Sequence, residues 1–191
     1  MDARTFLDFL GRIETLKTNT RHCTTRGGTP ETVAAHSWRL AVMAMLLRDQ
    51  FAELDMDKVI RMCLIHDFGE AVTGDIPTFL KTEKNEQTEN EALDGLLRTL
   101  PDDLYTELSV LYAEMEARVT PEARLYKTLD KLEAVIQHNE SDIRTWIPLE
   151  FTLNQTYATE DVKEFPYLAQ LREEMLKDTQ TKIAEYQKET T

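Results

Sequence analysis

Residues 59–67 read VIRMCLIHD, and this short stretch decides the fold that we expect. Apolar side chains surround the helix that the pattern predicts, which begins at Asp55 or Asp57. A helix without a polar face is normally buried at the centre of a domain. His66 and Asp67 follow at its end, where a buried carboxylate is costly unless it is paired or bound to a metal ion. The stretch therefore predicts a helical core with a polar pair attached to it.

Helical periodicity extends from this stretch in both directions, whereas strand-like alternation is nearly absent. Residues 29–31 and 120–122 both read Thr-Pro-Glu, the pattern of an N-cap followed by proline in the first helical turn. Helices are expected from these points to about Gln50 and Glu140, and the central helix is expected to end near Gly74. Further helices are expected around residues 6–13, 86–100, 102–118 and 167–187. The sequence predicts an all-α orthogonal bundle of about six to eight helices in one domain, residues 1–191.

The composition excludes several classes of partner. The chain has 35 acidic and 22 basic residues, a formal net charge of −13, which is unsuited to binding a nucleic acid polymer or an acidic membrane surface. Its two cysteines are too few for a disulfide framework, and residues 1–4 lack the pattern of a secretory signal. The longest apolar run, residues 40–47, is too short to cross a membrane. We therefore expect a cytoplasmic protein with no nucleic acid and no membrane partner.

Two imidazoles and two carboxylates occupy positions that the helical pattern turns toward the core. His36 lies on an apolar stripe upstream of His66 and Asp67, and Asp130 lies on a helix whose leucines face inward. Each also has an ordinary explanation, because a lone histidine on such a stripe is most often a hydrogen-bonded core residue. A His–Asp pair at a helix end is often an ion pair. Together the four side chains suit a borderline divalent cation such as Zn²⁺, Mn²⁺, Co²⁺ or Fe²⁺, and without one the two buried carboxylates would repel each other.

The order and spacing of these residues resemble the metal quartet of the HD-domain metal-dependent phosphohydrolase superfamily. Residues 30–38 (PETVAAHSW), 66–77 (HDFGEAVTGDIP) and 129–133 (LDKLE) are similar to three motifs of its 5'-deoxynucleotidase branch. The resemblance covers roughly residues 5–145 and implies a helical bundle of the HD-domain type. Residues from about 150 to 191 match weakly and are expected to form a helical extension that serves the fold or a dimer contact.

The resemblance implies that one divalent ion is held by four side chains, His36, His66, Asp67 and Asp130. Dinuclear HD enzymes need further histidines before the last aspartate, and none occurs between Asp67 and Asp130. A single ion is therefore the better interpretation. His138, eight residues beyond Asp130, is expected at the surface at a helix end.

The resemblance also assigns residues around the ion. Glu70 matches the family's general acid/base, one helical turn after His66, and Asp75 matches a second acid that faces the substrate. Arg21 matches an arginine that contacts the substrate phosphate, a role that its planar donor fork suits, and Arg26 is expected to assist it. Many members carry tryptophan directly after that arginine, lining the sugar pocket, where this chain has His22.

These observations predict a metal-dependent phosphoric monoester hydrolase acting on nucleoside 5'-monophosphates, preferentially deoxy ones. One alternative keeps the chemistry and changes the substrate to another small phosphorylated metabolite. Another is a non-catalytic nucleotide-sensing dimeric module that keeps the metal for stability, although such a module would not need Glu70, Asp75 and Arg21. A homodimer is expected by resemblance, and the sequence does not reveal its interface.

Overall fold

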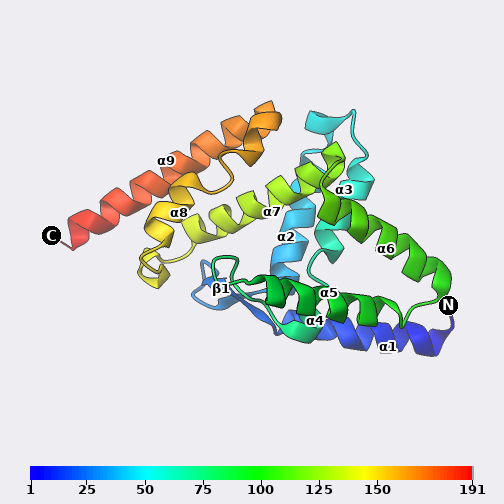
Figure 1. The fold of residues 1–191 in the computed structure, drawn as a ribbon. Helices are drawn as coiled ribbons and strands as arrows, with labels where there is room; N and C mark the ends of the chain where they lie inside the picture. Colours follow the sequence, from blue (N-terminus) through cyan, green and yellow to red (C-terminus); the bar gives the residue numbers. More distant parts are fainter. Residues whose placement is uncertain (191) are drawn as a thin grey trace.

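Helices make up most of the chain in the computed structural model, which describes residues 1–190, so the predicted all-α class is confirmed (Figure 1). In chain order, with η marking a 3-10 helix, the elements are α1 (Ala3–Ile13), η1 (Glu14–Lys17), β1 (Thr20–Thr24), β2 (Pro30–Thr32), α2 (Val33–Leu46), η2 (Arg48–Phe51), α3 (Met56–Ile65), α4 (Glu70–Thr73), α5 (Glu83–Leu97), α6 (Asp102–Ala117), α7 (Pro121–Glu140), η3 (Ile143–Thr145), α8 (Glu150–Thr156), η4 (Asp161–Glu164) and α9 (Pro166–Glu189). None of the described helices is long and apolar enough to span a bilayer.

The centre of the core is the predicted helix α3, which packs against both α2 and α7. Val59, Met62 and Cys63 are completely buried there. Burying an apolar side chain of this size stabilises the folded state by roughly 1.5–3 kcal/mol. The expectation that α3 is apolar and buried on every side was wrong, because Leu64 is 47% exposed and Arg61 pairs with Glu107 at the surface. The sequence letters alone did not show which face of α3 the neighbouring helices leave uncovered.

The segment after α3 differs from the single helix that was expected to reach Gly74. Helix α3 ends at Ile65, the chain turns through His66 and Asp67, and the short helix α4 follows. Gly74 does end α4, with φ +74°, a value that favours glycine. A Cβ on Gly69 would lie 2.9 Å from Glu89 Cγ, so α5 lies directly against this turn and only glycine leaves it room.

A short hairpin replaces the helix start that was expected at Thr29 and Pro30. Strand β2 pairs antiparallel with β1, with Thr20 opposite Thr32 and Thr24 opposite Pro30. Proline is tolerated here because β2 is an edge strand. Thr32 is the actual N-cap of α2, with its side chain accepting from the Ala35 N–H at 3.2 Å. The hairpin brings β1 against α7.

The carboxyl-terminal half returns to the long helix α7. Thr120 caps α7 and Pro121 occupies its first turn, as the sequence predicted. Helices α8 and α9 pack together, and α9 also packs along α7 before its end extends away from the rest of the molecule (Figure 1). The segment after residue 150 is thus joined to the same bundle as the motif-bearing segment.

Candidate active site

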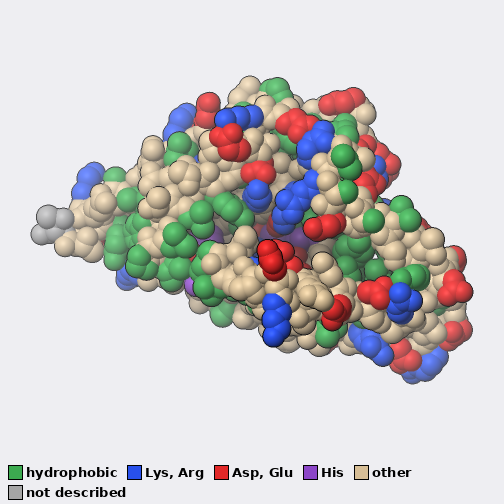
Figure 2. Space-filling view, viewed as in Figure 1, with side chains coloured by type: hydrophobic (Ala, Val, Ile, Leu, Met, Phe, Trp, Pro, Cys, Tyr) green, Lys and Arg blue, Asp and Glu red, His purple; other side chains and the backbone are tan. Residues whose placement is uncertain are grey.

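A cavity of about 720 Å³ opens between the hairpin, the α3–α4 turn, α7 and α8. In the space-filling view it is a hollow in the middle of one face, with histidine at its floor and charged side chains of both signs around it (Figure 2). Its lining includes Arg21, His66, Asp67, Glu70 and Asp130. Residues of α5 and α6 also line the cavity, so the fold brings many distant segments to one place.

The four predicted metal ligands converge at this floor. His66 Nε2 lies 3.0 Å from Asp67 Oδ2 and 3.6 Å from Asp130 Oδ1. His36 Nε2 lies 3.0 Å from the same Asp130 oxygen. Ligating atoms of His36, His66 and Asp67 all lie within 4.8 Å of one another. The structure thus brings the four side chains together at the cavity floor.

The tautomers of the two imidazoles suit metal binding. Cys63 O lies 2.9 Å from His66 Nδ1, so this nitrogen carries the proton and Nε2 is directed to the floor. Glu133 similarly holds His36 Nδ1. His66 Nε2 and Asp67 Oδ2 are buried and have no hydrogen-bond partner among the described residues. Buried imidazole nitrogens and carboxylate oxygens that no hydrogen bond satisfies are the ligand atoms that a borderline divalent cation binds, so the residues present fit such an ion.

The carboxylates strongly affect the charges at the floor. Burial opposes the charged form of His66, but the negative charges of Asp67 and Asp130 outweigh it and raise the pKa of His66 to about 10. Burial alone would raise the pKa of Asp67. The positive charge of the neighbouring His66 outweighs this effect and holds the pKa of this carboxyl well below its usual range. Lys127 Nζ, 2.7 Å from Asp130 Oδ2, supplies a further positive charge that the sequence analysis missed. A metal ion binding here would compete with protons on the imidazoles.

Glu70 and Asp75 lie on the α3–α4 side of the same cavity. Glu70 is only 4% exposed, and its Oε2 has no hydrogen-bond partner among the described residues. Burial, reinforced by the negative charges of Asp67 and Asp75, raises the pKa of Glu70 to about 9. Burial also raises the pKa of Asp75. Glu70 therefore holds a proton at neutral pH, which suits a group that delivers protons.

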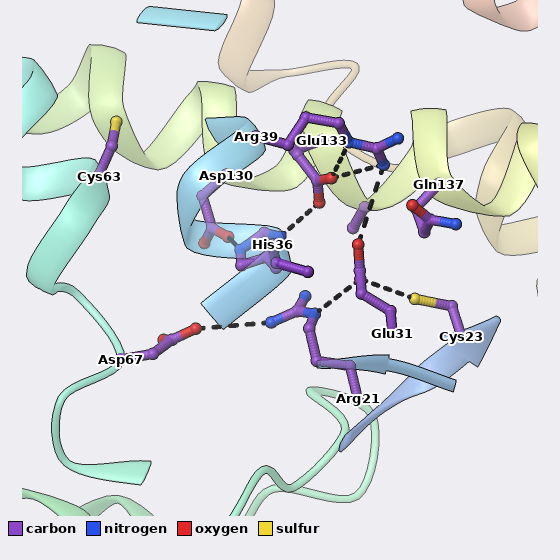
Figure 3. A network of polar contacts seen from close by, with 12 residues as sticks. Arg21, Cys23, Glu31, His36, Arg39, Cys63, Asp67, Asp130, Glu133 and Gln137 are labelled. Atoms are coloured by element: carbon purple, nitrogen blue, oxygen red, sulfur yellow. Dashed lines mark hydrogen bonds and ion pairs between the residues drawn. The ribbon is translucent and has the colours of Figure 1, made fainter. Parts of the chain in front are cut away.

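Arg21 projects from β1 toward the floor, between two carboxylates (Figure 3). Its Nη1 lies 3.5 Å from Asp67 Oδ2, and its Nε lies 3.4 Å from Glu31 Oε2. The side chain is mostly buried, so its positive charge is weakly screened by solvent. A cation in this position can bind an anionic group that enters the cavity of an otherwise acidic chain.

Behind the floor lies a buried polar network that the sequence analysis did not assign (Figure 3). Glu133 is completely buried and bonds both His36 Nδ1 and Arg39, the latter at 2.5 Å. Arg39 also donates to Glu140 at 2.7 Å, and the Cys23 thiol donates to Glu31 at 3.1 Å. A signal was available, because Glu133 follows Asp130 by three residues and so shares its helix face.

We expect Glu133→Gln to lower metal affinity about 10- to 100-fold, because removing the residue that orients a ligating imidazole typically has an effect of this size. A chelator competition titration of the purified chain measures the affinity. Excess metal should then restore the activity of the variant. Glu140→Gln is the matched control, since Glu140 also bonds Arg39 but does not contact His36. Equal affinity in Glu133→Gln and wild type would show that Glu133 does not orient His36.

Three other residues from the sequence analysis lie in different surroundings. His22 lines the cavity and packs edge-on against Phe79, with ring centroids 5.5 Å apart. Arg26 lies outside the cavity lining, mostly exposed, with Glu140 at 3.4 Å, and we do not assign it to the site. His138 was expected at the surface, and this was wrong: it lines the cavity and bonds Glu150 at 2.7 Å. Helix α8, which supplies Glu150, covers His138 from a segment that local sequence does not connect with it.

Comparison with known proteins identifies the family. A model described as HD domain matches residues 13–171. The chain belongs to this HD domain family. The match spans the hairpin, the metal quartet, α8 and the start of α9, which agrees with the joined bundle seen in the structure.

Two named relatives and one solved structure resemble this HD domain. The 5'-deoxynucleotidase HDDC2 of Mus musculus is 39% identical over 113 residues, 58% of the chain and 56% of the mouse protein. The 5'-deoxynucleotidase HDDC2 of Dictyostelium discoideum is 34% identical over 143 residues, 71% of the chain and 75% of that protein. The chain thus spans about half the length of the mouse relative. A predicted metal-dependent phosphohydrolase from Magnetospirillum magnetotacticum MS-1 superposes with a TM-score of 0.81 at 28% identity, covering 94% of this chain and 95% of that one.

Proposed function

We propose that this HD domain is a metal-dependent phosphomonoesterase that removes the 5'-phosphate from nucleoside monophosphates, preferentially deoxy ones. The observation that carries the proposal is the convergence of His66 Nε2 and Asp67 Oδ2, 3.0 Å apart and without a hydrogen bond among the described residues, with Arg21 at the floor of one cavity. The relatives named 5'-deoxynucleotidase support the substrate class.

We assign the ion to the quartet of His36, His66, Asp67 and Asp130, with one Mn²⁺, Co²⁺, Zn²⁺ or Fe²⁺ per chain. The two Nε2 atoms and two carboxylates are donors that each of these cations accepts. When bound, such an ion supplies Lewis acidity toward phosphoryl oxygens and lowers the pKa of a water molecule. Glu133 and the Cys63 carbonyl keep both imidazoles in the orientation that binding needs.

The chain's own side chains then bind the substrate and move the proton. Arg21 binds the phosphoryl oxygens and balances the negative charge that develops on them. Water attacks phosphorus as the bond from phosphorus to the 5'-oxygen breaks; the water's oxygen and hydrogens stay with the inorganic phosphate, which returns one proton to Glu70 after the nucleoside has left. Glu70, which holds a proton at neutral pH, donates it to that oxygen, so the nucleoside leaves as an alcohol. Asp75 faces the substrate from the same cavity wall.

The test is phosphate release from a panel of ribo- and deoxyribonucleoside 5'-monophosphates. It is run after chelation and again after adding Mn²⁺, Co²⁺ or Zn²⁺. We expect release only in the presence of metal, with higher kcat/KM for the deoxy substrates. Release that persists after complete chelation would contradict the metal-dependent reaction.

The panel also separates the two alternative functions. Metal-dependent release from another small phosphorylated metabolite, with none from nucleotides, would indicate a phosphatase of different specificity. Nucleotide binding without turnover of any phosphate ester would indicate a sensing module. The location of Arg21 and Glu70 around the quartet favours turnover, since a metal kept for stability needs neither.

We further propose that residues 1–191 act as one domain, in the cytoplasm, as a homodimer. One cavity is lined by elements from β1 to α8, which supports a single functional unit. Both cysteines are buried and unpaired, as in proteins of reducing compartments. Exposed apolar side chains on α1 and α2, including Phe6, Leu10 and Trp38, provide surface that a second copy would cover. Sedimentation velocity measures the mass, and a species of one chain would contradict the dimer.

A further inference from the structure

Helix α8 and the residue that follows it form a wall of the cavity that the sequence analysis did not expect. Glu150, Leu153, Asn154 and Tyr157 all line the cavity together with the metal-binding residues. The space-filling view shows apolar side chains gathered beside the hollow, on the side where Figure 1 draws α8 and β1 (Figure 2). The cavity therefore extends beyond the charged floor to α8, where polar and apolar side chains both line it.

Polar contacts hold both ends of α8 in place. At its start, buried Glu150 lies 3.2 Å from His22 Nε2 on β1 and 2.7 Å from His138 Nε2 on α7. At its end, buried Arg172 of α9 donates to the carbonyls of Asn154 at 2.8 Å and Tyr157 at 2.9 Å. Carbonyls at the carboxyl end of a helix lack hydrogen-bond donors within the helix, and here Arg172 is their donor. The wall is thus fixed against three other elements.

One side chain in this fixed wall lacks a partner. Asn154 is only 3% exposed, and its Nδ2 is buried without a hydrogen bond to any residue in the described part of the chain. Buried polar groups nearly always have a partner, and the neighbouring contacts give this amide none. An asparagine amide offers donor hydrogens and an acceptor oxygen together, as do the edges of nucleobases. The rings of His22, Phe79 and Tyr157 line the same cavity and provide flat surfaces for a planar ligand.

We propose that α8 is the base-binding wall of the cavity and that the side-chain amide of Asn154 recognises the hydrogen-bonding edge of the nucleobase. The proposal rests on the proposed function only in naming a nucleoside as the ligand. Asn154 determines specificity and takes no part in the chemical step, so it acts on binding and KM rather than on kcat. The quartet and Arg21 hold the phosphate of the same substrate.

The test measures the binding of four deoxynucleosides to the purified chain by titration calorimetry, which requires no turnover. Wild type should bind at least one of them, and Asn154→Leu and Asn154→Asp should each weaken that binding about 5- to 10-fold. The kcat/KM for 2-deoxyribose 5-phosphate, which has no base, should stay within about 2-fold of wild type. Asn154→Asp changes the side-chain volume little, and melting curves verify that each variant folds.

Gln155→Leu is the matched control, because Gln155 lies on the same helix, bonds the Phe151 carbonyl at 2.7 Å and does not line the cavity. Unchanged nucleoside affinity in both Asn154 variants, or no nucleoside bound by wild type, would overturn the proposal. Equal losses with 2-deoxyribose 5-phosphate would also overturn it, since they indicate a structural role. If wild type binds nucleosides, the Asn154 variants bind them less tightly and no nucleotide is hydrolysed, the proposed function fails and the base-binding wall stands.

Discussion

Asp67→Ala is expected to lower metal-dependent phosphate release at least about 10³-fold, since the metal supplies most of the charge stabilisation that such a reaction needs. The variant should also bind less metal than wild type. The physical reason is the position of Asp67 Oδ2, buried without a hydrogen-bond partner among residues 1–190 and 3.0 Å from His66 Nε2. Metal content by elemental analysis and phosphate release under identical conditions measure the two effects.

The control for this prediction is Asp57→Ala, which removes an aspartate at the surface, where it pairs with Arg48. It should leave both metal content and turnover unchanged. An Asp67→Ala variant that retains metal and turnover at wild-type levels would show that the quartet has been assigned wrongly. If the variant loses turnover but keeps its metal, Asp67 is not a metal ligand and would be reassigned to the groups that contact the substrate.

Glu70→Gln is expected to lower kcat by about 10²- to 10⁴-fold, the range for removal of a general acid or base. Metal content should stay at the wild-type level, because Glu70 is not among the four ligands. This separation of turnover from metal distinguishes it from Asp67→Ala. Steady-state kinetics and elemental analysis of the same preparations provide the comparison. Glu83→Gln, at an exposed position on α5, is the control.

Although Glu70→Gln should lower kcat, it should raise the stability of the folded chain. Burial and nearby negative charges raise the pKa of Glu70 from 4.5 to about 9, so the folded chain binds this proton more tightly than the unfolded chain. As pH rises from about 4.5 toward 9, the unfolded carboxyl ionises first, and the free energy of unfolding falls by up to about 1.4 kcal/mol per pH unit. Glutamine cannot ionise, so the free energy of unfolding of Glu70→Gln should not show this decrease with rising pH.

Metal-free Glu70→Gln should therefore melt at a higher temperature than metal-free wild type at pH 8, with a smaller difference at pH 5. Scanning calorimetry at the two pH values measures the difference. Lower activity combined with greater stability is expected where a buried ionisable group serves the reaction. Identical melting temperatures at both pH values would mean that Glu70 has an ordinary pKa, and its assignment as the proton donor would lose its physical basis.

The convergence of His36, His66, Asp67 and Asp130 was predictable because local sequence carries its signals. His66 and Asp67 follow helix α3 at the centre of the core, and helical spacing alone turns His36 and Asp130 toward the core. Gly74 was also predicted as a helix end, but the helix that it ends is α4. The break after Ile65 arises where α5 packs against Gly69, a contact between segments that no local pattern connects.

By itself, the sequence determined the helical class and the cap of α7 at Thr120, because each depends on periodicity or on spacing within a short segment. It also predicted that His36, His66, Asp67 and Asp130 lie together, and the structure places their side chains at one cavity floor. Only the tertiary structure decided which outer residues hold these four side chains and which helix forms the far wall of the cavity. Glu133 bonds His36 across 97 positions, and Arg172 bonds the Asn154 carbonyl across 18. Such contacts depend on which faces of distant helices meet, and that is settled by packing of the whole core.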